Sequence, residues 1–188
     1  MFRVLVAVSG HPGSGKSTLA LTVSHTLALP LLSKDGVKEA LFEGLGAADR
    51  EWSRRLGGAS WDLVYYMAGV LMAAARPFVL EGNFDPDRAR PILTGMARRH
   101  GYRVLEVFCT APPDVLQSRF RERALSGTRH PGHLDAQHLD EFMRRLEEPL
   151  RPLGIGPVLA VDTSRDDANT IGVRTVSWIT AQASFDGG

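Results

Sequence analysis

The sequence contains a single cysteine, Cys109, so no disulfide can form within the chain. A lone thiol is typical of a protein that works in a reducing compartment, and we expect the cytoplasm. No apolar run approaches the ~18 residues that a membrane helix needs. The N-terminal apolar run is too short, and too soon followed by a glycine-rich motif, to act as a signal peptide. The composition therefore predicts a cytoplasmic protein that does not enter a membrane.

The chain also lacks an excess of charge of either sign. Its formal net charge is +1, from 22 Lys and Arg against 21 Asp and Glu, which argues against nucleic-acid binding driven by bulk charge. It shows no internal repeat and no interdomain linker, and 188 residues suffice for one domain with a substantial core. We therefore expect a single domain over residues 1–183 and a frayed tail at 184–188. A monomer and a homodimer both remain open.

One motif dominates what is present. Residues 10–17 read Gly-His-Pro-Gly-Ser-Gly-Lys-Ser, which fits the phosphate-binding pattern G-x-x-x-x-G-K-[ST]. An apolar run leads into the motif and helical spacing leads out of it, the context that this loop requires. A strand–helix turn that binds nothing is the competing interpretation, but strand, loop, Lys-Ser and helix occur together. The motif therefore predicts binding of a nucleoside triphosphate.

Each part of this loop has an expected role. The glycines allow successive backbone N–H groups to turn toward an anion, and the start of the following helix adds further N–H groups. Lys16 is expected to reach the β- and γ-phosphates, and the Ser17 hydroxyl to ligate magnesium. The expected nucleotide contacts are Gly10, His11, Pro12, Gly13, Ser14, Gly15, Lys16, Ser17 and Thr18.

Strand and helix patterns alternate along the whole chain. Strands are expected at 2–8, 31–32, 78–81, 102–110 and 158–161. Helices are expected at 16–29, 37–45, 50–75, 87–100, 113–126, 136–150 and 166–183, the third of them broken at Gly57-Gly58. Aromatic and aliphatic residues of the third helix form one stripe, which indicates core packing rather than a ligand box. Alternation of this kind predicts an α/β fold with a parallel, doubly wound sheet whose ligands bind at the carboxyl ends of the strands.

Two carboxylates follow strands at that expected edge. Asp35 follows the second strand and is either the base that accepts the proton of an acceptor hydroxyl or only the cap of the helix expected at Val37. We favour the base, because Ser33 offers an alternative cap. Glu81 ends the third strand and is expected to hold a magnesium-bound water. Asn83 either orients a substrate or satisfies the turn.

Cationic and histidine side chains complete the candidate set. Arg119 and Arg123, on the helix expected at 113–126, and Arg129, in a polar segment at about 126–135, form either a cationic lid over the triphosphate or a solvated surface. A zinc site at His130, His133 and His138 is disfavoured because no cysteines cluster with them.

With these segments together, the chain resembles the P-loop kinases of the AAA-type ATP-binding family. It is similar more distantly to polynucleotide 5′-hydroxyl kinases, zeta toxins and chloramphenicol phosphotransferases. The resemblance implies a nucleotide-kinase fold with strand order 2-3-1-4-5, helices on both faces and a short lid. It implies that Asp35 is the catalytic base, that Arg119, Arg123 and Arg129 are lid arginines, and that the loop containing Thr163 borders the adenine.

The expected function is ATP- and magnesium-dependent phosphoryl transfer to a hydroxyl of a small molecule. A polynucleotide 5′-hydroxyl kinase is an alternative, for which Arg50, Arg54 and Arg55 near Trp52 could form a channel, although the near-neutral charge weighs against it. A nucleotide-dependent switch or ATPase module is the alternative of another class. A GTPase is disfavoured, because the sequence contains no N-K-x-D pattern and no D-x-x-G after the third expected strand.

Overall fold

The fold is built on one fully parallel sheet. We describe it from a computed structural model, which describes residues 3–46, 48–126, 130, 133, 139, 143, 144, 146 and 150–184. The strands are β1 (Val4–Gly10), β2 (Leu31–Ser33), β3 (Phe78–Glu81), β4 (Arg103–Thr110) and β5 (Val158–Asp162). Their order across the sheet is β2-β3-β1-β4-β5, and every neighbouring pair is parallel. The expected fold class and strand order are confirmed.

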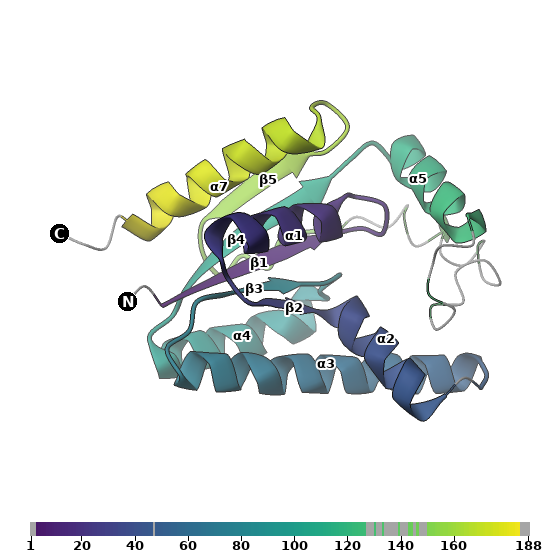
Figure 1. The fold of residues 1–188 in the computed structure, drawn as a ribbon, viewed down its shortest axis with the longest axis horizontal. Coiled ribbons are helices and arrows are strands. Elements are labelled where there is room, and N and C mark those ends of the chain that lie inside the picture. The colour runs from purple at the N-terminus through teal and green to yellow at the C-terminus, as the bar shows by residue number, and fades with distance from the viewer. Residues whose placement is uncertain are drawn as a thin grey trace.

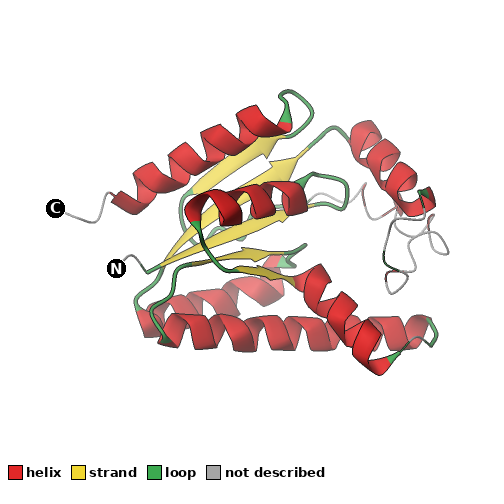
Figure 2. Ribbon diagram, viewed as in Figure 1, coloured by secondary structure: helices red, strands yellow, loops and turns green. Residues whose placement is uncertain are grey.

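Helices cover both faces of this sheet (Figures 1 and 2). The described helices are α1 (Lys16–Leu27), α2 (Lys34–Leu45), α3 (Arg50–Ala73), α4 (Pro86–His100), α5 (Pro113–Leu125) and α7 (Ala168–Ser184). Figure 1 shows α1 and α7 on one face and α3 and α4 on the other, while α2 and α5 stand beyond the strand ends. Within the described residues, none of the helices combines the length and apolar composition that a membrane crossing requires.

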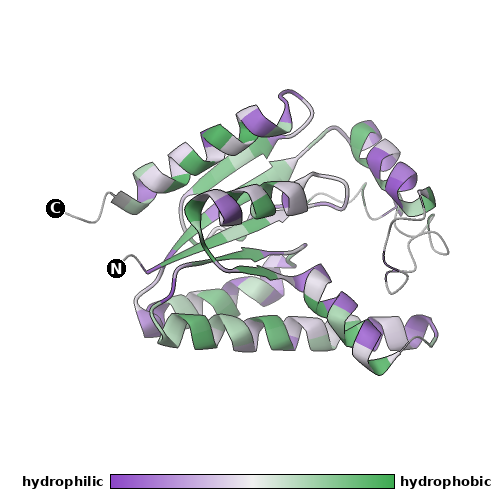
Figure 3. Cartoon of the chain, in the orientation of Figure 1, coloured by the Kyte–Doolittle hydropathy of each residue, from purple (hydrophilic) through white to green (hydrophobic). Residues whose placement is uncertain are grey.

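The two faces enclose separate hydrophobic cores. Strand residues of alternating parity, such as Leu5 and Val6, point to opposite faces, as the pleat of a strand requires. All seven residues of β1 are buried, which explains its continuous apolar run, because a parallel strand here is covered on both sides. Figure 3 shows the strands as mainly hydrophobic and the helices as mixed. The central strand is therefore a rigid base for the loop that follows it.

The structure corrects the expected boundaries at the second and third helices. The second helix begins at Lys34 rather than Val37, because Ser33 caps it and its Oγ accepts a hydrogen bond from Gly36 N at 3.3 Å. Asp35 therefore lies in the first turn of α2. The third helix continues through Gly57-Gly58 without a break. Buried residues on both sides of the glycines, including Leu56 and Ser60, hold this helix against its neighbours.

The stripe on α3 packs as expected. Val64, Ala68 and Met72 are buried in the core, with partly buried Trp61, Tyr65 and Leu71 against it. Other expectations concern residues outside the described ones: the polar segment apart from His130 and His133, most of the helix at 136–150, and the tail apart from Ser184. A single domain over 1–183 stays a prediction.

Candidate active site

The phosphate-binding loop leaves β1 at the point where that strand lies closest to β4. Gly10 is in register with Cys109, and a Cβ at Gly10 would approach the Cys109 carbonyl oxygen to 2.4 Å. Gly13 has φ +82°, and a Cβ there would lie 2.9 Å from the Leu116 carbonyl oxygen. Only glycine fits both positions. The loop therefore wraps tightly between β4 and α5, with its backbone facing the start of α1.

Helix α1 itself supplies neither a cap nor an acidic residue at its positive end. Its N-cap is Gly15 in a left-handed conformation, without a side-chain cap and without an acidic residue in the first turn. Each of the other described helices has a side-chain cap, an acidic residue in its first turn, or both. Helices α2, α3 and α4 have both, α5 has a first-turn acid, and Asp167 caps α7. An uncapped helix start after a glycine loop is the arrangement that binds phosphate.

Glu81 connects the loop to the neighbouring strands. Its carboxylate accepts hydrogen bonds from Ser17 Oγ at 3.0 Å and from Ser33 Oγ at 2.7 Å, and lies 3.7 Å from Lys16 Nζ. Glu81 is 2% exposed and Lys16 is 6% exposed. Three side chains therefore compensate the burial of this carboxylate.

These groups fit a magnesium ion. Ser17 Oγ and the Glu81 carboxylate converge at one point beside the phosphate loop, and magnesium takes oxygen ligands. The described residues contain no group of three or more His, Cys, Asp or Glu side chains that could hold a metal on its own. Magnesium does not require such a cage, since it usually binds through one or two protein oxygens plus phosphate and water. When bound, it would neutralise charge on the phosphates.

A pocket of about 280 Å³ opens on the α7 side of the loop. It is lined by Gly13, Gly15, Thr18, Leu19, Thr22, Arg119, Thr163, Asp166, Ala168 and Ile171. Arg119 donates to Thr163 Oγ1 and to Thr163 O, both at 3.0 Å. The structure thus brings Arg119, Thr163 and Thr18 together in one pocket beside the loop glycines.

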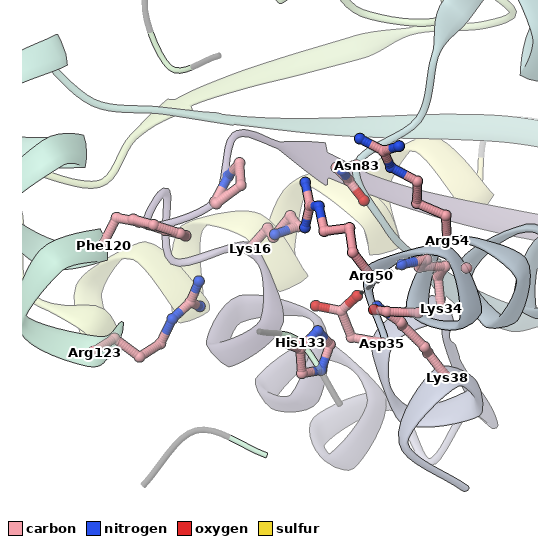
Figure 4. A pocket seen from close by; sticks show the side chains of 13 residues that line it. Lys16, Lys34, Asp35, Lys38, Arg50, Arg54, Asn83, Phe120, Arg123 and His133 are labelled. Carbon is pink, nitrogen blue, oxygen red and sulfur yellow. Dashed lines mark hydrogen bonds and ion pairs between the residues drawn. The ribbon is translucent and has the colours of Figure 1, made fainter. Parts of the chain in front are cut away.

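A second cleft, of about 190 Å³, lies on the α2–α3 side (Figure 4). Its described lining residues are Pro12, Lys16, Lys34, Asp35, Lys38, Arg50, Ser53, Arg54, Gly57, Asn83, Phe120, Arg123 and His133. Lys16 and Asp35 line it together, and Asp35 Oδ1 lies 3.2 Å from Lys34 Nζ. Because it opens at the lysine end of the phosphate loop, we call this cavity the acceptor cleft.

Helix α5 contributes residues to both cavities. Arg119 lines the pocket that contains Thr163, whereas Arg123, one turn later, lines the acceptor cleft with its guanidinium carbon 5.6 Å from the Phe120 ring centroid. Arg121 is exposed. The two expected lid arginines therefore face different cavities on either side of the loop, and Arg129 lies outside the described residues.

The histidines do not form the disfavoured zinc site within the described residues. His133 Nε2 lies 2.7 Å from Glu39 Oε1, and the His130 ring packs edge-on against Phe42. Both contacts attach these histidines to α2, and His138 lies outside the described residues.

Asn83 lies between the acceptor cleft and a third cavity of about 240 Å³. Trp61 and Tyr65 line this third cavity and stack with their ring centroids 5.6 Å apart. Burial raises the pKa of Tyr65 to about 12, against the opposing charge of Arg88, so this phenol stays neutral at physiological pH. The third cavity therefore adjoins the acceptor cleft at Asn83.

Sequence reasoning missed several lining residues of the acceptor cleft, among them Lys38 and Ser53. Lys38 and Ser53 occupy facing positions on α2 and α3, and Lys38 Nζ donates to Ser53 Oγ at 2.9 Å. Lysine is rare in this sequence, which has three lysines in total. All three lysines line the acceptor cleft. The scarcity of lysine in the sequence was therefore a signal that could have pointed to Lys38 as a site residue.

A family model described as an AAA domain matches residues 5–149. The chain belongs to this AAA domain family. A solved structure from Chloroflexus aurantiacus, whose name describes a candidate kinase, superposes on this AAA-domain chain with a TM-score of 0.83. The two chains are 35% identical, and the match covers 96% of this chain and 98% of the other.

Two curated relatives complete the comparison. A cytidylate kinase from Pyrobaculum arsenaticum is 30% identical over 146 residues, which covers 77% of this chain and 68% of that protein. An uncharacterised protein from Mycobacterium tuberculosis is 28% identical over 127 residues. The match covers 64% of this chain but only 26% of the mycobacterial protein, so this chain corresponds to about a quarter of that relative's length. Some relatives of the AAA-domain chain thus have kinase names. The chain itself has the strand order of P-loop kinases.

Proposed function

We propose that the protein is a phosphotransferase that uses ATP and magnesium to phosphorylate a hydroxyl group of a small molecule. One observation carries the proposal: Lys16 of the phosphate loop and the carboxylate Asp35 line the same cleft. A phosphate-binding cation and a proton acceptor are the two groups that this transfer needs from a protein. A switch or pure ATPase would not need a cleft at this end of the loop.

Each proposed role except that of Arg129 follows from a described position. The residues from Gly10 to Thr18, with Arg119 and Thr163, bind the nucleotide. Ser17 and Glu81 hold magnesium. Lys16, Arg119 and Arg123 stabilise the phosphates, and Arg129 is proposed for the same role although it lies outside the described residues.

The transfer step moves one proton and one phosphoryl group. The acceptor oxygen attacks the γ-phosphorus in line with the bridging oxygen that leaves with ADP. As the new O–P bond forms, the old P–O bond breaks, and the hydroxyl proton passes to an Asp35 carboxylate oxygen. Lys16 stays near the γ-phosphoryl oxygens throughout. Catalysis then consists mainly of positioning and charge compensation.

Calorimetry and a radiolabel screen test the proposal. We expect magnesium-dependent ATP binding that Lys16→Ala abolishes, because the cation that reaches the phosphates is lost. Transfer from [γ-³²P]ATP is then measured across nucleosides, aminoglycosides, phenicols, sugars and 5′-hydroxyl oligonucleotides. Full ATP affinity in Lys16→Ala would refute the role of the loop. ATP hydrolysis without transfer to any acceptor class would favour an ATPase module.

The polynucleotide kinase alternative has one supporting observation. Arg50 and Arg54, two of the arginines suggested for a channel, do line the acceptor cleft. The remaining parts point elsewhere: Arg55 is exposed and pairs with Glu51 at 2.8 Å, and Trp52 Nε1 donates to Gly46 O at 3.0 Å. Arg55 and Trp52 therefore do not line the cleft with Arg50 and Arg54 among the described residues, so a small acceptor is favoured.

A further inference from the structure

The acceptor cleft is far more basic than the chain as a whole. Six of its described lining residues are lysine or arginine, and Asp35 is the one acidic residue among them. The whole chain has a formal net charge of only +1. The cleft thus has a local excess of positive charge, which acidic residues elsewhere in the chain balance.

The distribution of lysine makes this concentration specific. The chain has three lysines and nineteen arginines, and all three lysines line the acceptor cleft. Lys16 is 6% exposed and Lys38 is 8% exposed, although lysine is normally among the most exposed residue types. Burying an ammonium group costs free energy unless something compensates its charge. Glu81 compensates Lys16 at 3.7 Å, and an anion in the cleft would further stabilise the cluster of cations that the three lysines join.

Part of the charge already has a proposed use. Lys16 and Arg123 approach from the phosphate loop and from α5, so the triphosphate accounts for them. Lys34 Nζ lies 3.2 Å from the Asp35 carboxylate. Three further cations, Lys38, Arg50 and Arg54, come from α2 and α3 on the opposite wall, and Figure 4 shows their side chains around the same cleft. These three are more than the transferred phosphate requires.

We propose that the acceptor carries an anionic group, a phosphate or a carboxylate, which Lys38, Arg50 and Arg54 bind while its hydroxyl faces Asp35. This inference rests on the proposed function and names the class of its acceptor. Guanidinium groups suit it because they hold phosphate and carboxylate oxygens through paired hydrogen bonds. Lys38 is held in place by its hydrogen bond to Ser53 on the facing helix.

The size of the cleft favours a small anionic acceptor over a polymer. Its volume of about 190 Å³ suits a phosphorylated or carboxylated metabolite. The adjacent arginines on α3 also diverge: Arg54 lines the cleft, while Arg55 pairs with Glu51 and is not among the described lining residues. A polynucleotide would use both of them along its backbone.

The divergence of Arg54 and Arg55 provides a matched pair of variants. The chain is first saturated with magnesium and AMPPNP, a non-hydrolysable ATP analogue, so that the phosphate loop is filled and its binding is recorded separately. Inorganic phosphate is then titrated by calorimetry, with acetate in a second arm and a 5′-hydroxyl oligonucleotide in a third. We expect Arg54→Ala to weaken binding of the anion about tenfold or more, equivalent to about 1.4 kcal/mol. Arg55→Ala should leave the affinity unchanged.

The three arms separate the outcomes. Preference for phosphate or for acetate identifies which anionic group the acceptor carries, and either one supports the inference. Absence of anion binding to the AMPPNP-saturated chain overturns it, as does an equal effect of the two variants, while nucleotide binding leaves the proposed function standing. Oligonucleotide binding weakened equally by Arg54→Ala and Arg55→Ala overturns it in favour of a polynucleotide. Failure to bind AMPPNP counts against the proposed function itself.

Discussion

Asp35 and Asp87 are both acidic residues in the first turn of a helix, but they face different surroundings. Asp35 lines the acceptor cleft beside Lys34, whereas the exposed Asp87 pairs with Arg151. Neither carboxylate is its helix cap, because Ser33 and Asp85 fill that role. If Asp35→Asn and Asp87→Asn differ in transfer rate, the difference would therefore not come from the loss of a helix cap.

We expect Asp35→Asn to lower the transfer rate by about 10²–10⁴-fold, the usual contribution of a general base. ATP affinity should stay within a few-fold, because Asp35 faces the acceptor side. Single-turnover transfer at saturating ATP and acceptor measures the effect, using an acceptor from the screen, and Asp87→Asn serves as the control. A rate within threefold of the parent enzyme would leave Asp35 with a structural role only.

Cys109 should be chemically inert in the folded protein. It is 1% exposed at the end of β4 beneath the phosphate loop, and burial raises the pKa of its thiol to about 12. Because the thiolate is the reactive form, we expect no alkylation by iodoacetamide at pH 8 in native protein and complete alkylation in guanidinium chloride. Mass spectrometry gives the extent of reaction. Rapid native alkylation would mean that β4 opens at the loop.

At the scale of elements, α2 and α3 together form one wall of the acceptor cleft. Ser33 has two roles, because its hydroxyl accepts from Gly36 N and donates to Glu81. The start of α2 is thereby tied to the end of β3, so Asp35 is placed relative to the phosphate loop by backbone structure. On α3, Gly57 lines the cleft without a side chain, and a Cβ there would meet nothing within 4 Å.

Glycine within a helix costs up to about 1 kcal/mol relative to alanine, so Gly57→Ala should stabilise the fold. We expect the melting temperature to rise by about 2–4 °C per kcal/mol. In the enzyme, the added methyl group should raise the KM of the acceptor by occupying the cleft. Gly95→Ala on α4 is the matched control, since a Cβ there also meets nothing within 4 Å and Gly95 is not among the described residues that line the cleft. A Gly57→Ala enzyme with higher stability and unchanged KM would show that the acceptor does not reach α3.

At the scale of the whole molecule, the sheet carries one buried acid away from the site. Glu106 on β4 is 1% exposed, and its Oε2 accepts from Gly154 N at 2.9 Å. Its Oε1 has no hydrogen-bond partner among the described residues. Burial raises the pKa of Glu106, although the backbone N–H groups of Gly154 and Leu153 and the charge of Arg90 oppose the rise.

The sign of the resulting pH dependence follows from that direction. With a folded-state pKa above the unfolded value, the stability contribution of Glu106 is complete below about pH 4.5 and is lost as the pH rises through the folded pKa. Glu106→Gln should therefore stabilise the protein at pH 7, on the order of 1 kcal/mol, and lose this advantage near pH 4. Thermal unfolding at both pH values tests this, with exposed Glu122→Gln as the control. Destabilisation at pH 7 would mean that hydrogen bonding to the ionised carboxylate outweighs its burial.

The sequence by itself determined the phosphate loop and the frame around it. The spacing from Gly10 to Ser17 and the apolar run before it depend on local backbone geometry, so neighbours in sequence suffice to predict them. The strand that ends at Glu81 was predicted for the same reason. The partners of the Glu81 carboxylate were not predicted, because Ser33 and Lys16 reach it only after β2 and β1 pair on either side of β3.

Only the tertiary structure decided how the acceptor cleft is assembled. Lys38 and Arg54 lie on different helices, and no local pattern brings them to one cavity. Packing also overrode propensity on α3, where buried neighbours keep the helix continuous through Gly57-Gly58. Packing likewise assigned Arg119 and Arg123 to separate cavities, because α5 lies against the phosphate loop and contributes to a cavity on each side of that loop. Local sequence determines backbone conformation, whereas the meeting of distant charges depends on which helices the sheet places side by side.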